Sequence, residues 1–139
     1  MRRSAMSAAL NPAQPQLDAN KKAVMEFYET AFNRKDADAV TALVGDPYIQ
    51  HNPQIGDGVA GLQARLRQLA SAFPDLRVQV KRMVAEGDYV SAHVHAVRVP
   101  GQRGVAIMDV FRLEDGKLVE HWDVMQDIPE QSQNPNGMF

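Results

Sequence analysis

Hydrophobic side chains in the first half of the chain recur at the spacing of helices. From Lys21 onward they fall three or four residues apart, which predicts a first helix. The pattern breaks and then resumes over residues 37–44 as a second, shorter helix, for which Asp36 is a suitable N-cap. A third amphipathic helix is indicated from Leu62 onward, and Pro74 ends it.

Beyond this point apolar and polar residues alternate, which is the period of β-strands. Short turns separate the runs and give four strands in a meander, and a short strand over Tyr48–Asn52 precedes the third helix. Helices followed by strands are typical of an α+β fold, with helices on one face of a curved antiparallel sheet. The four long strands are predicted at Leu76–Glu86, Tyr89–Val99, Val105–Leu113 and Leu118–Gln126.

The length of 139 residues and a hydrophobic content of 45% fit one globular domain, which we place over residues 20–139 with a tail from 127. Residues 1–19 carry two arginines and an apolar run too short for a signal peptide, so we expect a flexible or surface-wrapped arm.

Composition narrows the partners and the chemistry. The chain has no cysteine, which excludes disulfides and thiolate metal sites. The net charge of −2 gives no electrostatic reason to expect nucleic acid or an acidic membrane surface. No apolar run approaches the roughly 20 residues that span a bilayer. We therefore expect a cytoplasmic protein with neither nucleic acid nor membrane as a partner.

The hairpin over residues 108–125 carries acids where a sheet ordinarily carries apolar side chains. Asp109 alternates with Ile107 and Phe111, and Asp123 alternates with His121 and Met125. An acid on an apolar face loses contact with water and must find a partner or change its pKa. A pocket explains these acids better than stability does.

Whether the two acids share a face depends on the turn at residues 114–116. A two-residue turn would place Asp109 opposite Trp122, with the acids on opposite faces. A three-residue turn with a glycine bulge would place Asp109 opposite His121, with Asp123 on the same face. Gly116 at the third position favours the bulged form, because that residue needs a positive φ.

Histidines supply further candidate chemistry. His93 and His95 alternate on one strand and therefore share a face. Such a pair can bind a metal with a third ligand from Asp109, His121 or His51, but a polar pocket wall or a partly exposed sheet face fits the pair better. His51 ends the short strand at the expected mouth of the pocket.

Tyr28 lies on the apolar stripe of the first helix. A tyrosine there is ordinarily part of the core with its hydroxyl satisfied by a neighbour. If the hydroxyl reaches the pocket instead, it becomes a hydrogen-bond donor to a carbonyl or enolate oxygen.

Three motifs carry a resemblance to a known family: YIQHNP at Tyr48–Pro53, MDVFR at Met108–Arg112 and DGKLVEHWD at Asp115–Asp123. From about residue 20 to the end, the chain resembles the SnoaL-like polyketide cyclase group of the nuclear-transport-factor-2-like superfamily. The resemblance implies a cone-shaped sheet wrapped around helices and an apolar cavity inside. It also implies a homodimer formed through the outer face of the sheet, to which Trp122 would belong.

The resemblance also implies roles for individual residues. Asp109 and Tyr28 match the protonated acid and the tyrosine that form the oxyanion hole of ketosteroid isomerases. The general base of those enzymes corresponds here to Asn52, which accepts no proton at neutral pH. In SnoaL-type cyclases an acid/base aspartate lies on the last strand, where Asp123 resembles it, and Asp109 replaces an assisting histidine.

These observations favour an enzyme that transfers a proton next to a carbonyl, in an aldol-type cyclisation or an isomerisation, on a small apolar or carbonyl-containing molecule. Asp123, paired with His95 or His121, would take the proton, and Asp109 with Tyr28 would stabilise the enolate oxygen. This mechanism needs no cofactor and no metal. The residues expected to bind substrate are Tyr28, His51, Asn52, His93 and His121.

Two alternatives remain open. The first is a non-catalytic binder of a small apolar ligand, in which the polar groups only orient the ligand. The second is an epoxide hydrolase or dehydratase on the same scaffold. The hydrolase would need an arginine in its active site, and Arg112 is expected to point outward.

Overall fold

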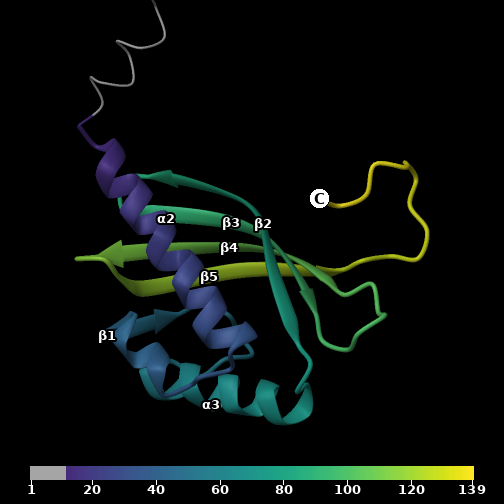
Figure 1. Ribbon diagram of the computed structural model, residues 1–139, viewed down its shortest axis with the longest axis horizontal. Coiled ribbons are helices and arrows are strands. Elements are labelled where there is room, and N and C mark those ends of the chain that lie inside the picture. The colour runs from purple at the N-terminus through teal and green to yellow at the C-terminus, as the bar shows by residue number, and fades with distance from the viewer. Residues whose placement is uncertain (1–11) are drawn as a thin grey trace, which may run out of the picture.

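The computed structural model describes residues 12–139 and has the predicted α+β architecture (Figure 1). Two α-helices and five strands make up most of it, with a π-helical turn at Glu29–Asn33 and a 3₁₀ turn at Ala39–Ala42 between them. The elements are α2 (Gln14–Tyr28), β1 (Val44–Gln50), α3 (Gly58–Ala72), β2 (Arg77–Glu86), β3 (Tyr89–Val97), β4 (Val105–Glu114) and β5 (Lys117–Asp127).

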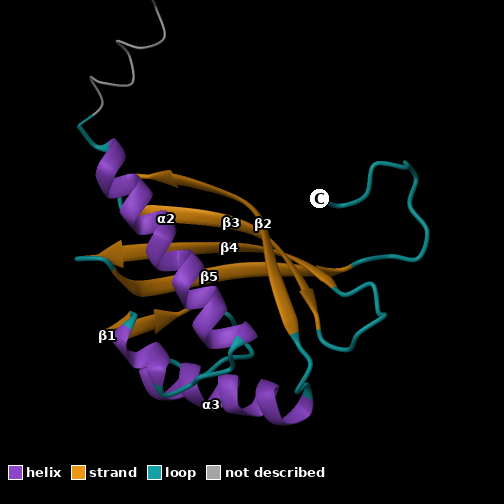
Figure 2. Cartoon of the chain, in the orientation of Figure 1, coloured by secondary structure: helices purple, strands orange, loops and turns teal. Residues whose placement is uncertain are grey.

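The five strands form one sheet in the order β1-β5-β4-β3-β2, and both α-helices lie on the same side of it (Figure 2). Strands β2 to β5 form the predicted antiparallel meander. β1 pairs in parallel with β5, so the sheet is mixed rather than wholly antiparallel. Alternation of side chains identifies a strand but does not give the direction of a neighbour that is distant in sequence.

The helices differ from the prediction at two places. α2 begins at Gln14 with a proline in its first turn, so residues 14–19 are helical rather than part of an arm. Residues 1–11 of the expected arm lie outside the described part. The expected second helix is only the 3₁₀ turn at Ala39–Ala42, although Asp36 does accept the backbone N–H of Ala39 at 2.9 Å.

That segment stays short because the chain enters the sheet at Val44, which is paired with Leu118 of β5. The third predicted helix corresponds to α3 and begins at Gly58. Within residues 12–139, no helix combines the length and apolar character that crossing a bilayer requires.

The β4–β5 hairpin corrects the predicted turn. Asp115 and Gly116 have φ values of 51° and 78°, as in a two-residue type I′ turn, and Glu114 is paired with Lys117 across it. The expected three-residue bulged turn is therefore wrong. The bulge lies further along the hairpin, where β5 contains Val119 as an extra residue.

This bulge restores a common face for the two acids. A one-residue slip moves every side chain beyond it to the other face of a strand. As a result Asp109 is paired directly with Asp123, rather than with His121 or Trp122. Phe111 is paired with His121.

The core fills the space between the helices and the inner face of the sheet. Phe27 and Tyr28 of α2 contact Phe111 edge-on, with ring centroids 5.6 and 5.8 Å apart. All three rings are at most 3% exposed. Aromatic packing of this kind fixes the end of α2 against β4 and directs the Tyr28 hydroxyl toward the sheet.

Candidate active site

A pocket lies between the helices and the inner face of β3, β4 and β5. Most of its lining is apolar and comes from α2, α3 and the sheet. Its uncharged polar and acid–base residues come from the end of α2, from β1 and the residue pair after it, and from the β4–β5 hairpin. These residues are Tyr28, Tyr48, Gln50, Asn52, Asp109, His121 and Asp123.

Asp109 is 6% exposed and lies between two partners. Tyr28 donates its hydroxyl proton to Oδ2 across 2.5 Å, and Oδ1 lies 2.8 Å from Nε2 of His121. Burial and then the charge and hydrogen bond of Asp109 raise the pKa of Tyr28 well above its usual value. Tyr28 therefore remains a donor, and in the free protein it donates to Asp109.

His121 has a defined tautomer at its other ring nitrogen. Nδ1 lies 2.7 Å from Oε1 of Gln50, and the same oxygen accepts the backbone N–H of Asn52 at 2.9 Å. A backbone N–H only donates, so the atom facing Nδ1 is an acceptor and Nδ1 carries a proton. Nε2 and Asp109 then share one further proton, either as imidazolium with carboxylate or as imidazole with carboxylic acid.

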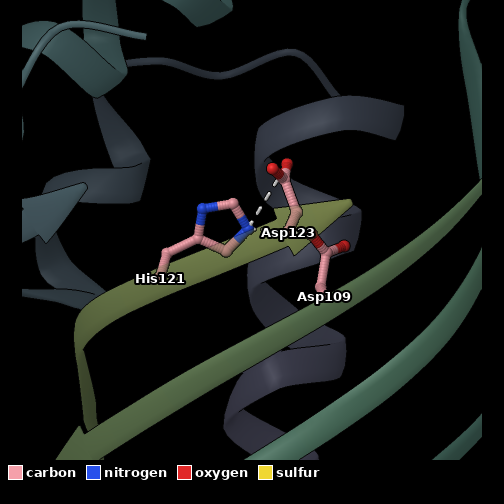
Figure 3. Close-up of side chains that lie close together, drawn as sticks. All are labelled: Asp109, His121 and Asp123. Carbon is pink, nitrogen blue, oxygen red and sulfur yellow. Dashed lines mark hydrogen bonds and ion pairs between the residues drawn. The ribbon is translucent and has the colours of Figure 1, made fainter. Parts of the chain in front are cut away.

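Asp123 lies beside this pair on β5 (Figure 3). Its Oδ2 is 3.8 Å from Nε2 of His121, and its side chain is 9% exposed. The amide nitrogen of Asn52 lies 2.9 Å from each carboxylate oxygen. Asn52 is held in this orientation because its Oδ1 accepts the backbone N–H of Gln54. A fixed donor facing both oxygens stabilises the negative charge of Asp123.

Two residues of the site were not predicted. Tyr48 is 1% exposed, and burial followed by the charges of Asp109 and Asp123 raises its pKa. No hydrogen bond to its hydroxyl is present among the described residues, so the group is available in the pocket. Gln50 is the second. Tyr48, Gln50 and Asn52 are two residues apart along the chain, and this spacing was the signal that could have placed all three on one face.

His93 and His95 share a face, as predicted, but it is the outer face of the sheet. Buried Ala92 and Val94 alternate with them on the inner face. Nε2 of His95 lies 2.7 Å from the carbonyl oxygen of Arg103, and His93 is hydrogen-bonded to Arg82. The pairing of His95 with the acids of the pocket is therefore wrong, and His93 does not line the pocket.

His51 also lies outside the pocket. Its Nε2 is 2.7 Å from Oε2 of Glu120, and its ring stacks on Trp122 with the centroids 4.8 Å apart. Arg112 donates to the same carboxylate from the outer face, as expected of a residue pointing outward. Hydrogen bonds from His51 and Arg112 lower the pKa of Glu120. These contacts hold His51 on the protein surface rather than in the pocket.

Asp109, His121 and Asp123 also have the donor types of a metal site. One ligand atom from each lies within 4.8 Å of the others. Carboxylates and imidazole suit several divalent metals. However, Tyr28 and Asn52 already donate to the two carboxylates, and His121 contacts Asp109 directly. Hydrogen bonding within the protein therefore accounts for the arrangement.

The mixed sheet, the two helices on its inner side and the pocket between them define a nuclear-transport-factor-2-like domain. The sequence profile of the SnoaL-like domain matches residues 24–121, well over half of the chain. The chain therefore belongs to the SnoaL-like domain family. Asp123 lies two residues beyond the matched region.

Solved structures show the same fold. TsrD from Streptomyces laurentii is 28% identical with a TM-score of 0.65, over 77% of this chain and 88% of that one. IdmH from Streptomyces antibioticus is 21% identical with a TM-score of 0.65, over 76% and 91%. A SnoaL-like polyketide cyclase from Agrobacterium tumefaciens is 16% identical with a TM-score of 0.65, over 77% and 91%. A search of curated protein sequences found no significant match.

Proposed function

We propose that the protein is an enzyme that moves a proton next to a carbonyl group, in an aldol-type cyclisation or an isomerisation, without a cofactor. The observation that carries the proposal is the convergence of Asp123, the Asp109–His121 pair and Tyr48 in one apolar pocket. Membership of the SnoaL-like family supports it, since that family includes a protein called a polyketide cyclase.

In this reaction Asp123 takes a proton from the carbon next to the carbonyl, and the electron pair of the broken C–H bond forms an enolate. The enolate oxygen accepts hydrogen bonds from the Tyr48 hydroxyl and from the proton shared by Asp109 and His121. Tyr28 keeps Asp109 in place, and Asn52 keeps Asp123 in place.

An isomerisation ends when the proton returns from Asp123 to a different carbon of the enolate. In a cyclisation the enolate carbon instead bonds to a second carbonyl carbon of the same molecule. The alkoxide formed there then takes the proton from Asp123, so the acid is regenerated as a carboxylate. Apolar walls favour both routes, because excluding water strengthens the interactions with the developing charge.

Exchange of carbon-bound hydrogen for deuterium tests the proposal without the natural substrate. We expect the protein to accelerate exchange in at least one member of a panel of linear diketones and cyclic ketones in D₂O, read by mass spectrometry. Asp123→Asn should lower that rate by about 10²–10⁴-fold, the usual range for a general base, while the melting temperature stays near that of wild type.

Asp127→Asn is the matched control, because Asp127 ends the same strand, is exposed and lies outside the pocket. Its exchange rate should equal that of wild type. If wild type accelerates exchange in no member of the panel, or if Asp123→Asn retains the full rate, the proposal is wrong.

The predominantly apolar lining of the pocket supports a second candidate, a non-catalytic binder of a small apolar ligand. A binder would be stabilised thermally by ketones of the panel but would accelerate exchange of none of them. An enzyme would show an exchange rate that depends on pH, because Asp123 must be ionised to act.

A further inference from the structure

Two arginines line the same pocket and have no carboxylate partner among the residues that the structure describes. Arg65 of α3 and Arg98, which directly follows β3, are both half-buried. Arg65 donates to the amide oxygen of Gln68, and the guanidinium of Arg98 lies 5.8 Å from the ring centroid of Phe73. Within residues 12–139 neither guanidinium forms an ion pair, whereas the neighbouring Arg67 pairs with an acid at 2.7 Å.

Arg98 lies at the far end of the pocket from the acids. Ala92 of β3 is paired with Asp109, and Arg98 follows six residues later, which is about 20 Å along an extended strand. The β3–β4 loop and the C-terminal end of α3 lie together at that end of the molecule (Figure 1).

Apolar side chains line the pocket between the two ends. Val94 and Ala96 lie between Ala92 and Arg98 on the inner face of β3, and Leu69 of α3 belongs to the same lining. Along β3 the pocket is therefore polarised, with acids at one end, an apolar middle and the guanidinium group of Arg98 at the other end. Arg65 lines the same pocket from α3.

We infer that the substrate is an apolar carbonyl compound carrying an anionic group, a carboxylate or a phosphate, at the end remote from the reacting carbonyl, and that Arg65 and Arg98 bind this group. The inference rests on the proposed function for the position of the carbonyl. A guanidinium donates two parallel hydrogen bonds to either kind of anion, and such charge-assisted bonds are among the strongest in proteins. The anionic group would orient the molecule so that its carbonyl reaches the acids.

Matched ligands test the inference by calorimetric titration. The probes are a medium-chain oxo-carboxylate, the corresponding oxo-alkyl phosphate and the methyl ester of the carboxylate. Wild type should bind at least one of the anions about tenfold more tightly than the neutral ester. The preferred anion identifies which of the two groups the arginines select.

Arg98→Gln and Arg65→Gln should each weaken binding of that anion by about tenfold and leave binding of the ester unchanged. Arg98→Lys should lose less affinity for the anion than Arg98→Gln does, because lysine keeps the positive charge. Arg67→Gln is the control, because Arg67 is exposed and paired with Asp38 outside the pocket. Ester binding as tight as that of both anions, no binding of either anion at millimolar concentration, or an anion preference that survives in the double glutamine variant would each overturn the inference.

The same probes separate this inference from the proposed function. Deuterium exchange into the ester by wild type reports on the proton transfer alone. Asp123→Asn should lower the exchange rate by about 10²–10⁴-fold and keep the preference for the anion. A protein that prefers the anion through its arginines but exchanges no hydrogen would contradict only the proposed function.

Discussion

In the proposed reaction, the proton between Asp109 and His121 separates the acid of the site from its base. Within residues 12–139 Asp123 receives hydrogen bonds only from Asn52, which leaves it able to accept a proton in this reaction, whereas the Asp109–His121 pair already holds one that it can share. Like-charged groups this close would otherwise oppose each other's ionisation. The imidazole between the two carboxyl groups allows one to remain charged while the other is partnered.

Gln50 determines which ring nitrogen of His121 holds its proton, and we expect Gln50→Leu to remove that control. The variant leaves Nδ1–H of His121 and the backbone N–H of Asn52 without their shared acceptor. Losing a buried acceptor costs about 1–3 kcal/mol of stability. It should also lower the deuterium-exchange rate by about tenfold and shift its pH profile.

The ¹⁵N chemical shifts of His121 measure the tautomer directly. Gln50→Glu is the matched variant, because it keeps an acceptor oxygen for Nδ1 and should keep the Nδ1–H tautomer. A purely structural role for Gln50 predicts lower stability in Gln50→Leu with an unchanged tautomer and an unchanged pH profile.

At the scale of residues, the sequence predicted which side chains carry the chemistry better than it predicted which residues they contact. The alternation of Asp109 and Asp123 with apolar residues located the hairpin side chains that the structure brings together. His93 and His95 were assigned to the site, but they belong to the alternative that the sequence also allowed, a partly exposed sheet face, because two polar residues in alternation with Ala92 and Val94 fit an outer face equally well. The amide oxygen of Gln50 connects the backbone N–H of Asn52, on its own segment, with His121 of β5, and no pattern within one strand reveals the contact with His121.

At the scale of elements, the bulge in β5 decides whether there is a site. Without the extra residue Val119, Asp123 would face the outer side of the sheet while Asp109 remained inside. The prediction that Asp109 and Asp123 share a face was correct, but its reason was wrong, because it considered only the turn at residues 114–116. The bulged Val119 lies instead against Gly45 of β1, which is far away in the sequence.

Gly45 of β1 makes room for the bulge, and we expect Gly45→Ala to destabilise the fold. A Cβ atom at this position would lie 2.7 Å from Cγ1 of Val119, which is buried and β-branched. Overpacking of this kind costs about 1–3 kcal/mol in the free energy of unfolding. Urea denaturation of the variant measures the cost.

A double-mutant cycle shows whether the cost arises from this contact. In a Val119→Ala background the clash is removed, so the further change Gly45→Ala should cost less than about 0.5 kcal/mol. Equal costs in the two backgrounds would mean that Gly45 is needed for another reason, such as the path of the β1 backbone.

At the scale of the whole molecule, the two faces of the sheet have different surroundings. The inner face holds the helices and the pocket. The outer face presents the exposed pair Met108 and Val124 next to the half-buried pair Val110 and Trp122. Helix positions and the meander were readable from periodicity, but the extent of this outer patch required the register of all four strands.

We expect this outer patch to be the contact surface of a homodimer, as the family resemblance implied. Val124 is 71% exposed at its centre, and exposed apolar clusters of this kind mark interaction surfaces. Val124→Asp places a charge in the contact, which costs several kcal/mol when it is buried without a partner. The variant should therefore elute as a monomer under conditions where wild type elutes as a dimer, as measured by size-exclusion chromatography with light scattering.

Val99→Asp is the matched control, because Val99 is also exposed, at 42%, but lies beyond the end of β3. It should remain dimeric. The melting temperature distinguishes a lost interface from a lost fold: at concentrations where both variants are monomeric, Val124→Asp and Val99→Asp should melt together. A wild-type protein that is monomeric at tens of micromolar, or a Val124→Asp variant that stays dimeric, would place the patch outside any self-association of this chain.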